Sequence, residues 1–242
     1  MLKLPAEIRN RIWRSVLNNG RLHVIKRSSR DKTGYNLYRC SSNSQRQVSD
    51  KSQDSDKVTL YVDNRRPAHR HWACVQDESP RVLGLALLQT CRQIHREAAL
   101  LPFSETHFVC GDIRRFVNLV GRMLIHQASA LRQVTVQYLP CLTDFKDIPR
   151  LQPLVGRLRS LSAVTMSMEL ITRDSFLRHA RNDVLKVVGT LKVLPLERVA
   201  ITLHQPESPL VFGAYTWTGS GVSEEDLELF RGEVSELLFP TE

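Results

Sequence analysis

Long apolar runs and paired cysteines are both missing from this sequence. No stretch approaches the roughly 20 apolar residues that a membrane-spanning helix needs, and the first residues lack the apolar centre of a secretory signal. The five cysteines are an odd number, widely spaced and without a CxxC pair, so they do not form the pattern of a disulfide framework. We therefore expect an intracellular protein, cytoplasmic or nuclear, that is not associated with a membrane.

Motifs that bind phosphate or activate a nucleophile are also missing. The eleven glycines never form GxGxxG or GxxxxGK, and neither HExxH nor GxSxG occurs. Cys91 and His95 stand four residues apart, a spacing that would place a thiol and a base on one helix face. Cys91, however, belongs to an apolar stripe, which is typical of a structural thiol. The sequence predicts no enzyme and no cofactor.

One group of metal-ligand residues occurs, formed by His69, His71 and Cys74 with Cys40 as a fourth member. Zinc requires four such ligands arranged as a tetrahedron. The spacing here is irregular, and residues 64–71 are dense in positive charge, which repels a cation. We therefore expect no metal site.

The net charge of +9 is unevenly distributed. Residues 201–242 contain one Arg and eight acidic residues, whereas residues 1–200 contain 33 Lys and Arg against 17 Asp and Glu. Either an acidic C-terminal helix packs on a basic body, or the basic body attracts nucleic acid or an acidic protein surface. The basic stretches 26–30 and 64–71 have few aromatic neighbours for stacking on bases, so a solvated loop is the simpler interpretation.

The first part of the chain predicts a helix, two strands and a polar stretch. Pro5 and Glu7 suit a helix start, and five apolar residues then recur at helical spacing: Ile8, Ile12, Trp13, Val16 and Leu17. Asn18, Asn19 and Gly20 end the pattern. Residues 22–25 and 58–62 alternate like strands that pair as a hairpin, across a polar stretch from 26 to 57 that we expect to be a disordered loop.

Two further helices and a strand are expected before residue 125. A helix starts near Ser79 and Pro80 and continues with one apolar stripe until Pro102 ends it. Residues 106–110 predict a strand. Asp112 then caps a helix whose inward residues are Ile113, Phe116, Val117, Val120 and Leu124.

A pattern then recurs in the second half of the chain. Leu131, Leu161 and Leu196 each precede an alternating apolar segment, whose valines at 134, 164 and 199 stand 30 and 35 residues apart. Helical stretches occupy 151–158 and 176–191 between these segments. Strand–helix units at this period predict neighbouring parallel strands, either as true repeats or as an ordinary small α/β sheet. A last helix opens at Ser223, with Asp226 three residues on in a capping-box arrangement.

Two segments resemble an F-box, and their order resembles a group of fungal F-box-like proteins. The segment from Leu4 to Trp13 (LPAEIRNRIW) is similar to the opening F-box helix, and the segment from Leu87 to Ala98 (LLQTCRQIHREA), followed by LLPF, is similar to a later one. A family F-box is contiguous, whereas residues 14–86 separate the two segments here. The resemblance covers residues 1–110 and implies binding to the Skp adaptor of a ubiquitin ligase, with the later units capturing substrate. It assigns the adaptor-facing positions to Leu4, Pro5, Ile8 and Ile12.

Together these observations predict an α/β fold in a single domain over residues 1–242. A split F-box-like helical pair with a small sheet (1–110) precedes strand–helix units of leucine-rich-repeat-like character (111–242). The expected function is a protein-interaction module, and the F-box resemblance implies a substrate-recruiting subunit of a ubiquitin ligase. The alternatives are a non-catalytic scaffold unrelated to ubiquitin and a basic nucleic-acid-associated protein.

Arg9 predicts a link between the two F-box-like helices. With Ile8 at 0° and about 100° per residue, Arg9 falls inside the apolar arc of its helix. A charged group there must reach water or find a partner. Glu97 is the candidate, because a guanidinium binds a carboxylate through two hydrogen bonds; the alternative is that Arg9 extends along the surface.

Overall fold

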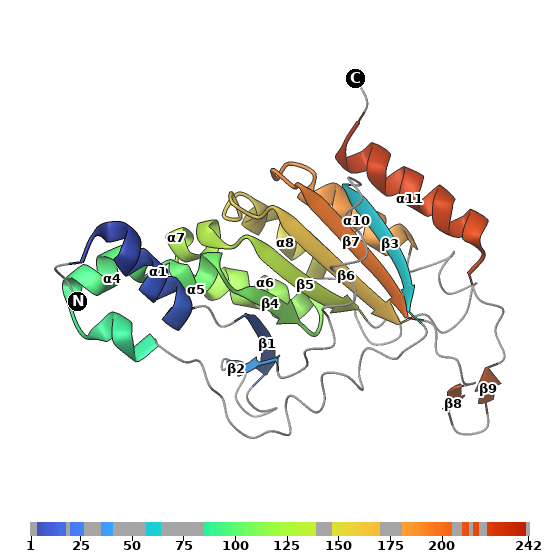
Figure 1. Ribbon diagram of the computed structural model, residues 1–242. Helices are drawn as coiled ribbons and strands as arrows, with labels where there is room; N and C mark the ends of the chain where they lie inside the picture. Colours follow the sequence, from blue (N-terminus) through green and yellow to red (C-terminus); the bar gives the residue numbers. More distant parts are fainter. Residues whose placement is uncertain are drawn as a thin grey trace.

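The structure is a computed structural model that describes residues 4–17, 20–26, 35–40, 57–63, 85–138, 147–169, 181–204, 210–212, 215–217 and 222–240. Its centre is a seven-stranded mixed sheet in the order β2-β1-β4-β5-β6-β7-β3 (Figure 1). Within this sheet β1 and β2 pair antiparallel, and every other neighbouring pair is parallel. The strands are β1 (Arg21–Lys26), β2 (Tyr35–Arg39), β3 (Val58–Asp63), β4 (His107–Cys110), β5 (Gln133–Tyr138), β6 (Ala163–Glu169) and β7 (Arg198–His204).

The recurring valines occupy one row across the sheet. Val134 pairs with Val164, and Val164 pairs with Val199, in three adjacent parallel strands. The predicted neighbouring parallel strands are therefore confirmed, and so is the α/β class. The row continues through Phe108 and Leu22 on one side and Val58 on the other. This is the geometry of a small α/β sheet, and a leucine-rich-repeat character is not confirmed.

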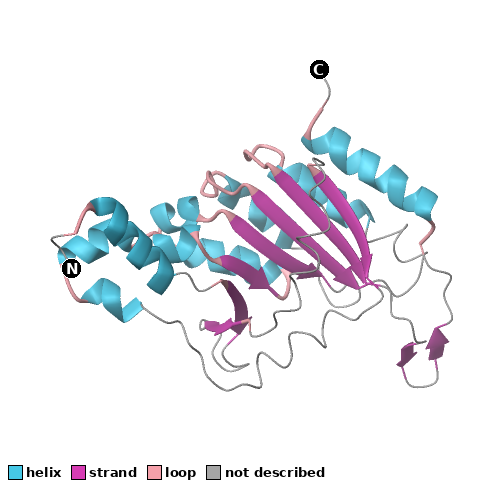
Figure 2. Cartoon of the chain, viewed as in Figure 1, coloured by secondary structure: helices cyan, strands magenta, loops and turns pink. Residues whose placement is uncertain are grey.

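One layer of helices covers the face of the sheet that carries this row (Figures 1 and 2). The main hydrophobic core lies between the two layers, where the strand residues pack against Phe116, Leu151, Val188 and Phe230. The helices of this layer are α6 (Ile113–Arg122), α8 (Ile148–Val155), α10 (Arg181–Leu191) and α11 (Glu224–Leu238), with α7 (Ile125–Ala130) between α6 and β5. The predicted cap of α6 is confirmed, because the Asp112 carboxylate accepts a hydrogen bond from the Arg115 N–H at 2.6 Å.

The acidic C-terminal helix α11 packs on the body of the protein. This is one of the two arrangements that the uneven charge distribution predicted. Its apolar residues Leu227, Phe230 and Val234 are buried, and it lies against α10 and β3. Ser223 caps its start by accepting from the Asp226 N–H at 3.2 Å. An ion pair between Arg181 and Glu233 joins α10 to α11. Packing of an acidic helix against a basic neighbour thus offsets part of the charge asymmetry.

A second, smaller core belongs to a helical unit at one end of the sheet. This unit consists of α1 (Ala6–Leu17), the 3-10 helix η2 (Leu85–Gln89), α4 (Arg92–Ala98) and α5 (Leu101–Ser104). Its core contains the buried residues Trp13, Leu17, Ile94 and Ala98. Figure 1 places the unit beyond β1 and β4, at the opposite end of the molecule from α11. Helices from two distant parts of the sequence therefore form one packed unit.

The predicted hairpin between residues 22–25 and 58–62 is wrong. The antiparallel partner of β1 is β2, which lies within the stretch expected to be a disordered loop. β3 instead pairs parallel with β7 at the far edge of the sheet, where α11 packs against it. An alternating apolar strand fits either position, next to β1 or next to β7, so the pattern of β3 alone does not predict which strand it pairs with. Residues 41–56 lie outside the described part of the chain.

The predicted single helix up to Pro102 is also wrong. The chain leaves the helical conformation at Cys91, whose backbone is extended (φ −157°, ψ 157°). The Thr90 hydroxyl donates to the Leu87 carbonyl at 2.7 Å, and Cys91 Sγ accepts from the Ile94 N–H at 3.4 Å. These local bonds end η2 and cap α4, because such side chains compete with the helix for backbone groups. Pro102 does not end α4; it lies in the first turn of α5, where a missing N–H costs nothing.

The opposite face of the sheet is predominantly polar. Side chains alternate between faces along a strand, so the residues beside the valine row point away from the helices. On β5, β6 and β7 these include Thr135, Thr165, Ser167, Thr202 and His204. Two hydrogen bonds link them across strands: His107 Nε2 to Thr135 Oγ1 at 2.7 Å, and Ser167 Oγ to His204 Nε2 at 2.9 Å. The small, polar character of this face distinguishes it from the apolar face under the helices.

Within the described residues, no helix has the length and apolar character required to cross a membrane. The prediction of a single domain over residues 1–242 stays a prediction.

Among the described residues, one buried hydroxyl makes no hydrogen bond, which gives a test of the packing. Thr106, just before β4, is 1% exposed, and its Oγ1 is unpaired. We expect Thr106→Val to raise the free energy of unfolding by about 1 kcal/mol, because it removes a desolvated polar atom at nearly constant volume. Urea unfolding followed by circular dichroism measures this.

Thr135→Val is the matched control, since its buried hydroxyl bonds to His107. We expect that change to lower the free energy of unfolding. A loss of stability in both variants would contradict the unpaired state of Thr106.

Candidate protein-interaction site

Helix α1 begins and ends where its sequence predicts. Pro5 precedes the first helical residue, and its carbonyl accepts from the Arg9 N–H at 3.1 Å. After Leu17 the chain turns at Gly20, which has a φ of 61° that an L side chain rarely adopts. The Gly20 carbonyl then accepts from the His107 N–H at 2.8 Å. The turn therefore fixes the end of α1 to the start of β4.

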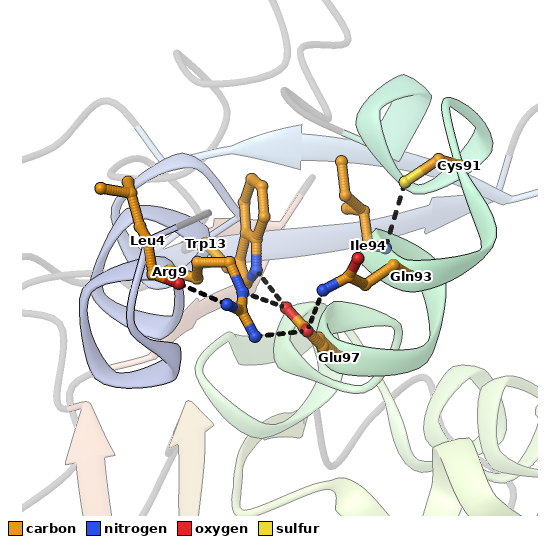
Figure 3. Close-up of polar contacts among 7 residues, drawn as sticks. All are labelled: Leu4, Arg9, Trp13, Cys91, Gln93, Ile94 and Glu97. Carbon is orange, nitrogen blue, oxygen red and sulfur yellow. Dashed lines mark hydrogen bonds and ion pairs between the residues drawn. The ribbon is translucent and has the colours of Figure 1, made fainter. Parts of the chain in front are cut away.

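The side chains of Arg9 and Glu97 meet between α1 and α4 (Figure 3). Arg9 Nε donates to Glu97 Oε2 at 3.0 Å, and Arg9 Nη2 donates to Glu97 Oε1 at 2.8 Å. Only 15% of the Arg9 side chain and 19% of the Glu97 side chain are exposed. The two-bond geometry expected from the sequence is present, and the alternative of an arginine extended along the surface is wrong.

Glu97 is a shared acceptor for donors from both helices. Trp13 Nε1 donates to Oε2 at 3.2 Å from α1, and Gln93 Nε2 donates to Oε1 at 2.9 Å from the preceding turn of α4. Hydrogen bonds from Arg9, then Gln93, then Trp13 lower the pKa of Glu97 from 4.5 to about 2. Each of these donors favours the charged carboxylate. Glu97 is therefore ionised at neutral pH and joins the two helices.

An apolar ridge remains on the other side of α1. We define this ridge as Leu4, Ile8, Ile12 and Val16, which follow one another at intervals of four residues. Leu4, Ile8 and Val16 are 37%, 41% and 42% exposed, and Ile12 is half-buried. Trp13 and Leu17, on the opposite side, are fully buried in the small core. The ridge is thus the part of the helix that its own unit does not cover.

The positions assigned by the F-box resemblance occupy this exposed side. Leu4, Pro5 and Ile8 are exposed, and Ile12 lies at the margin of the small core. The Leu4 carbonyl also accepts a hydrogen bond from Arg9, which holds the start of the ridge next to the Glu97 network (Figure 3). Leu100, 40% exposed, precedes α5, a helix that packs against α1. It adds an apolar side chain to the surface of the same unit.

Sequence reasoning missed three members of this site. Val16 was not among the assigned partner-binding positions but is exposed on the ridge, and Trp13 and Gln93 were not assigned as partners of Glu97. The i,i+4 spacing of Gln93 and Glu97 on one helix was an available signal. No signal in the sequence indicated the hydrogen bond from Trp13 to Glu97, because that bond depends on how α1 and α4 cross.

The other candidate residues do not form a site in the described part of the chain. Cys91 bonds to the Ile94 N–H, while His95 is exposed. His69, His71 and Cys74 lie outside the described residues, as does the basic stretch 64–71. Among the residues that are described, no three His, Cys, Asp or Glu side chains gather closely enough to hold a metal ion.

The fold defines a two-layer α/β protein with a helical unit assembled from separate segments. A family profile with the description "Domain of unknown function (DUF7730)" matches residues 1–141, and the chain belongs to this family. The match includes the whole helical unit, the apolar ridge and strands β1 to β5. Comparison with curated proteins and with solved structures gives no match.

A double-mutant cycle tests whether Arg9 and Glu97 hold the two helices together. We expect Arg9→Ala and Glu97→Ala each to lower the midpoint of urea unfolding. The double variant should lose clearly less than the sum of the two, because residues in direct contact are coupled. The pair Arg14 and Glu105, 3.4 Å apart with Arg14 61% exposed, is the control. We expect no measurable coupling for this surface pair, and equal coupling in both cycles would contradict the assignment.

The pKa of Glu97 predicts a pH dependence of stability. Its folded pKa of about 2 lies below the ordinary value of 4.5, so its contribution is fully present above about pH 4.5 and is lost as the pH falls toward 2. We expect the difference in unfolding midpoint between wild type and Glu97→Gln to be constant from pH 7 to 5 and to shrink between pH 4.5 and 2.5. Glu236→Gln is the control, because it removes the same charge from an exposed position of α11. A difference for Glu97→Gln that stays unchanged down to pH 2.5 would refute this role.

Proposed function

We propose that this chain is a protein-interaction subunit that binds a Skp-type adaptor of a ubiquitin ligase through the apolar ridge of α1. The main observation in support is that the ridge is exposed, while the opposite side of the same helix is packed against the small core. Trp13 and Leu17 are buried, and Arg9 is bound to Glu97. An exposed apolar stripe on a fixed helix is a preorganised surface, so binding does not require ordering the helix.

The helical unit supports the proposal despite the separation of its segments in sequence. An F-box is a set of packed helices, and here α1, η2, α4 and α5 pack around a core of their own. The intervening residues contribute β1, β2 and β3 to the sheet instead of separating the helices. The packing of these helices into one unit supports the proposal, although strands are inserted between them in the sequence.

The size of the ridge sets what the interface must include. A 12-residue helix is about 18 Å long, and four side chains along it supply less than the roughly 800 Å² that each partner usually buries. The adaptor would therefore also contact the adjoining surface of the unit, which includes the exposed Leu100. A central apolar side chain such as Ile8 would contribute most to the binding energy.

Co-purification with a Skp adaptor, followed by titration calorimetry, tests the proposal. We expect Ile8→Asp to weaken binding by about 2 kcal/mol or more, because it places a charge in an apolar contact. Val193→Asp is the control, since Val193 is 73% exposed and lies after α10, outside the helical unit. It should bind like wild type.

Circular dichroism must show both variants folded. No adaptor binding by wild type, or equal binding by Ile8→Asp, would reject the proposal. Affinity purification with mass spectrometry would then identify the partner of an unrelated scaffold.

A further inference from the structure

Two exposed arginines give α4 a positively charged face. Arg92 and Arg96 are four residues apart, so their side chains lie on one side of the helix. Like charges at this spacing repel each other and do not stabilise the helix that carries them. The one carboxylate of α4, Glu97, is already bound to Arg9 of α1. The face is therefore not explained by the stability of α4.

The two arginines lie on the outer side of the contact between α4 and α1. Each stands one residue before Gln93 or Glu97, the row of α4 from which Glu97 binds α1. The residues that follow this row, Ile94 and Ala98, are buried in the small core. At about 100° per residue, the arginines and the core residues fall on opposite sides of the row. The arginine face thus points away from the small core.

The apolar ridge lies on the outer side of the same contact. Ile12 and Val16 each stand one residue before Trp13 or Leu17, which are buried in the small core. Figure 3 shows α1 and α4 on either side of the Arg9 and Glu97 side chains. The ridge on α1 and the arginines on α4 therefore border this ion pair from its two sides and form one surface.

The opposite border of the ridge has a different charge pattern. There α1 carries Glu7 and Arg11, which are both exposed and four residues apart on one face. An acid and a base at this spacing offset each other's charge. The positive charge beside the ridge is therefore concentrated on the side of α4.

We propose that the ridge and the arginine face of α4 together bind an acidic amphipathic helix of the partner. Its apolar side chains would cover the ridge, and its carboxylates would face Arg92 and Arg96. This inference rests on the proposed function and adds the chemistry of the partner surface to it.

Two physical arguments lead to this partner. A row of side chains at intervals of four residues fits a groove between two such rows of a facing helix. A neutral or basic helix in that position would leave the arginines without a counter-charge or place like charges side by side, which costs binding energy. Carboxylates instead attract the partner before contact and orient it over the ridge.

Association rates of the full chain with the Skp adaptor test the arrangement. At an ionic strength of about 0.15 M, where a charge acts over about 8 Å, we expect the double variant Arg92→Glu with Arg96→Glu to associate about tenfold more slowly than wild type. The difference should nearly vanish at about 1 M, where that distance is about 3 Å. Should the reversed variant not fold by circular dichroism, Arg92→Gln with Arg96→Gln should show a smaller loss, of about threefold.

Arg159→Glu with Arg198→Glu is the matched control. Both arginines are exposed and lie outside the helical unit, and the double change alters the net charge by the same amount. It should slow association by less than about twofold. Equal slowing by the two reversals would show attraction to net charge only and overturn the inference. So would adaptor binding that the arginine variants leave unchanged, a result that keeps the proposed function.

A pair of designed helical peptides decides the inference when the adaptor does not bind and the proposed function fails. Both carry a leucine stripe, flanked by glutamates in one and by lysines in the other. Wild type should bind the glutamate peptide at least tenfold more tightly. Reversal of Arg92 and Arg96 should remove this preference, Ile8→Asp should weaken binding, and the Arg159 and Arg198 control should behave like wild type. No preference in wild type would overturn the inference.

Discussion

The carboxylate of Glu97 is the contact on which the helical unit depends. It accepts hydrogen bonds from Arg9 and Trp13 of α1 and from Gln93 of α4. Without it, Arg9 would be a charged group facing an apolar helix contact with no counter-charge. Its bonds fix the rotation of α1, so that Trp13 and Leu17 point into the small core and the ridge points outward. The exposure of the ridge is therefore a consequence of one partly buried ion pair together with the packing beneath it.

The sheet explains how distant segments reach one helical unit. β1 follows α1 directly and pairs with β4, which follows α5. The parallel pairing of these two strands brings α1 and α5 to the same end of the sheet. The residues between α1 and η2 do not interrupt the unit, because β1 and β2 extend one edge of the sheet and β3 completes the other. The pairing of β1 with β4 thus joins the helical unit to the two-layer body.

The two faces of the sheet have different roles because alternate residues of each strand have different chemistry. Valine, leucine and methionine fill one face and are covered by helices, whereas threonine, serine, histidine and arginine occupy the other.

The sequence by itself determined the local elements whose signals depend on neighbouring residues: α1 with its glycine turn, the Asp112 and Ser223 caps, and three strands in register at Val134, Val164 and Val199. It also identified Arg9 and Glu97, because a charge within an apolar arc needs a partner. Only the tertiary structure decided that β3 pairs with β7, that residues 35–39 form the partner of β1, and which residues of α1 face outward. Alternating apolar residues predict that one face of a strand will be buried, but they do not predict which strand will pair with it. The apolar side of an amphipathic helix likewise does not predict how much of that side its neighbours will cover.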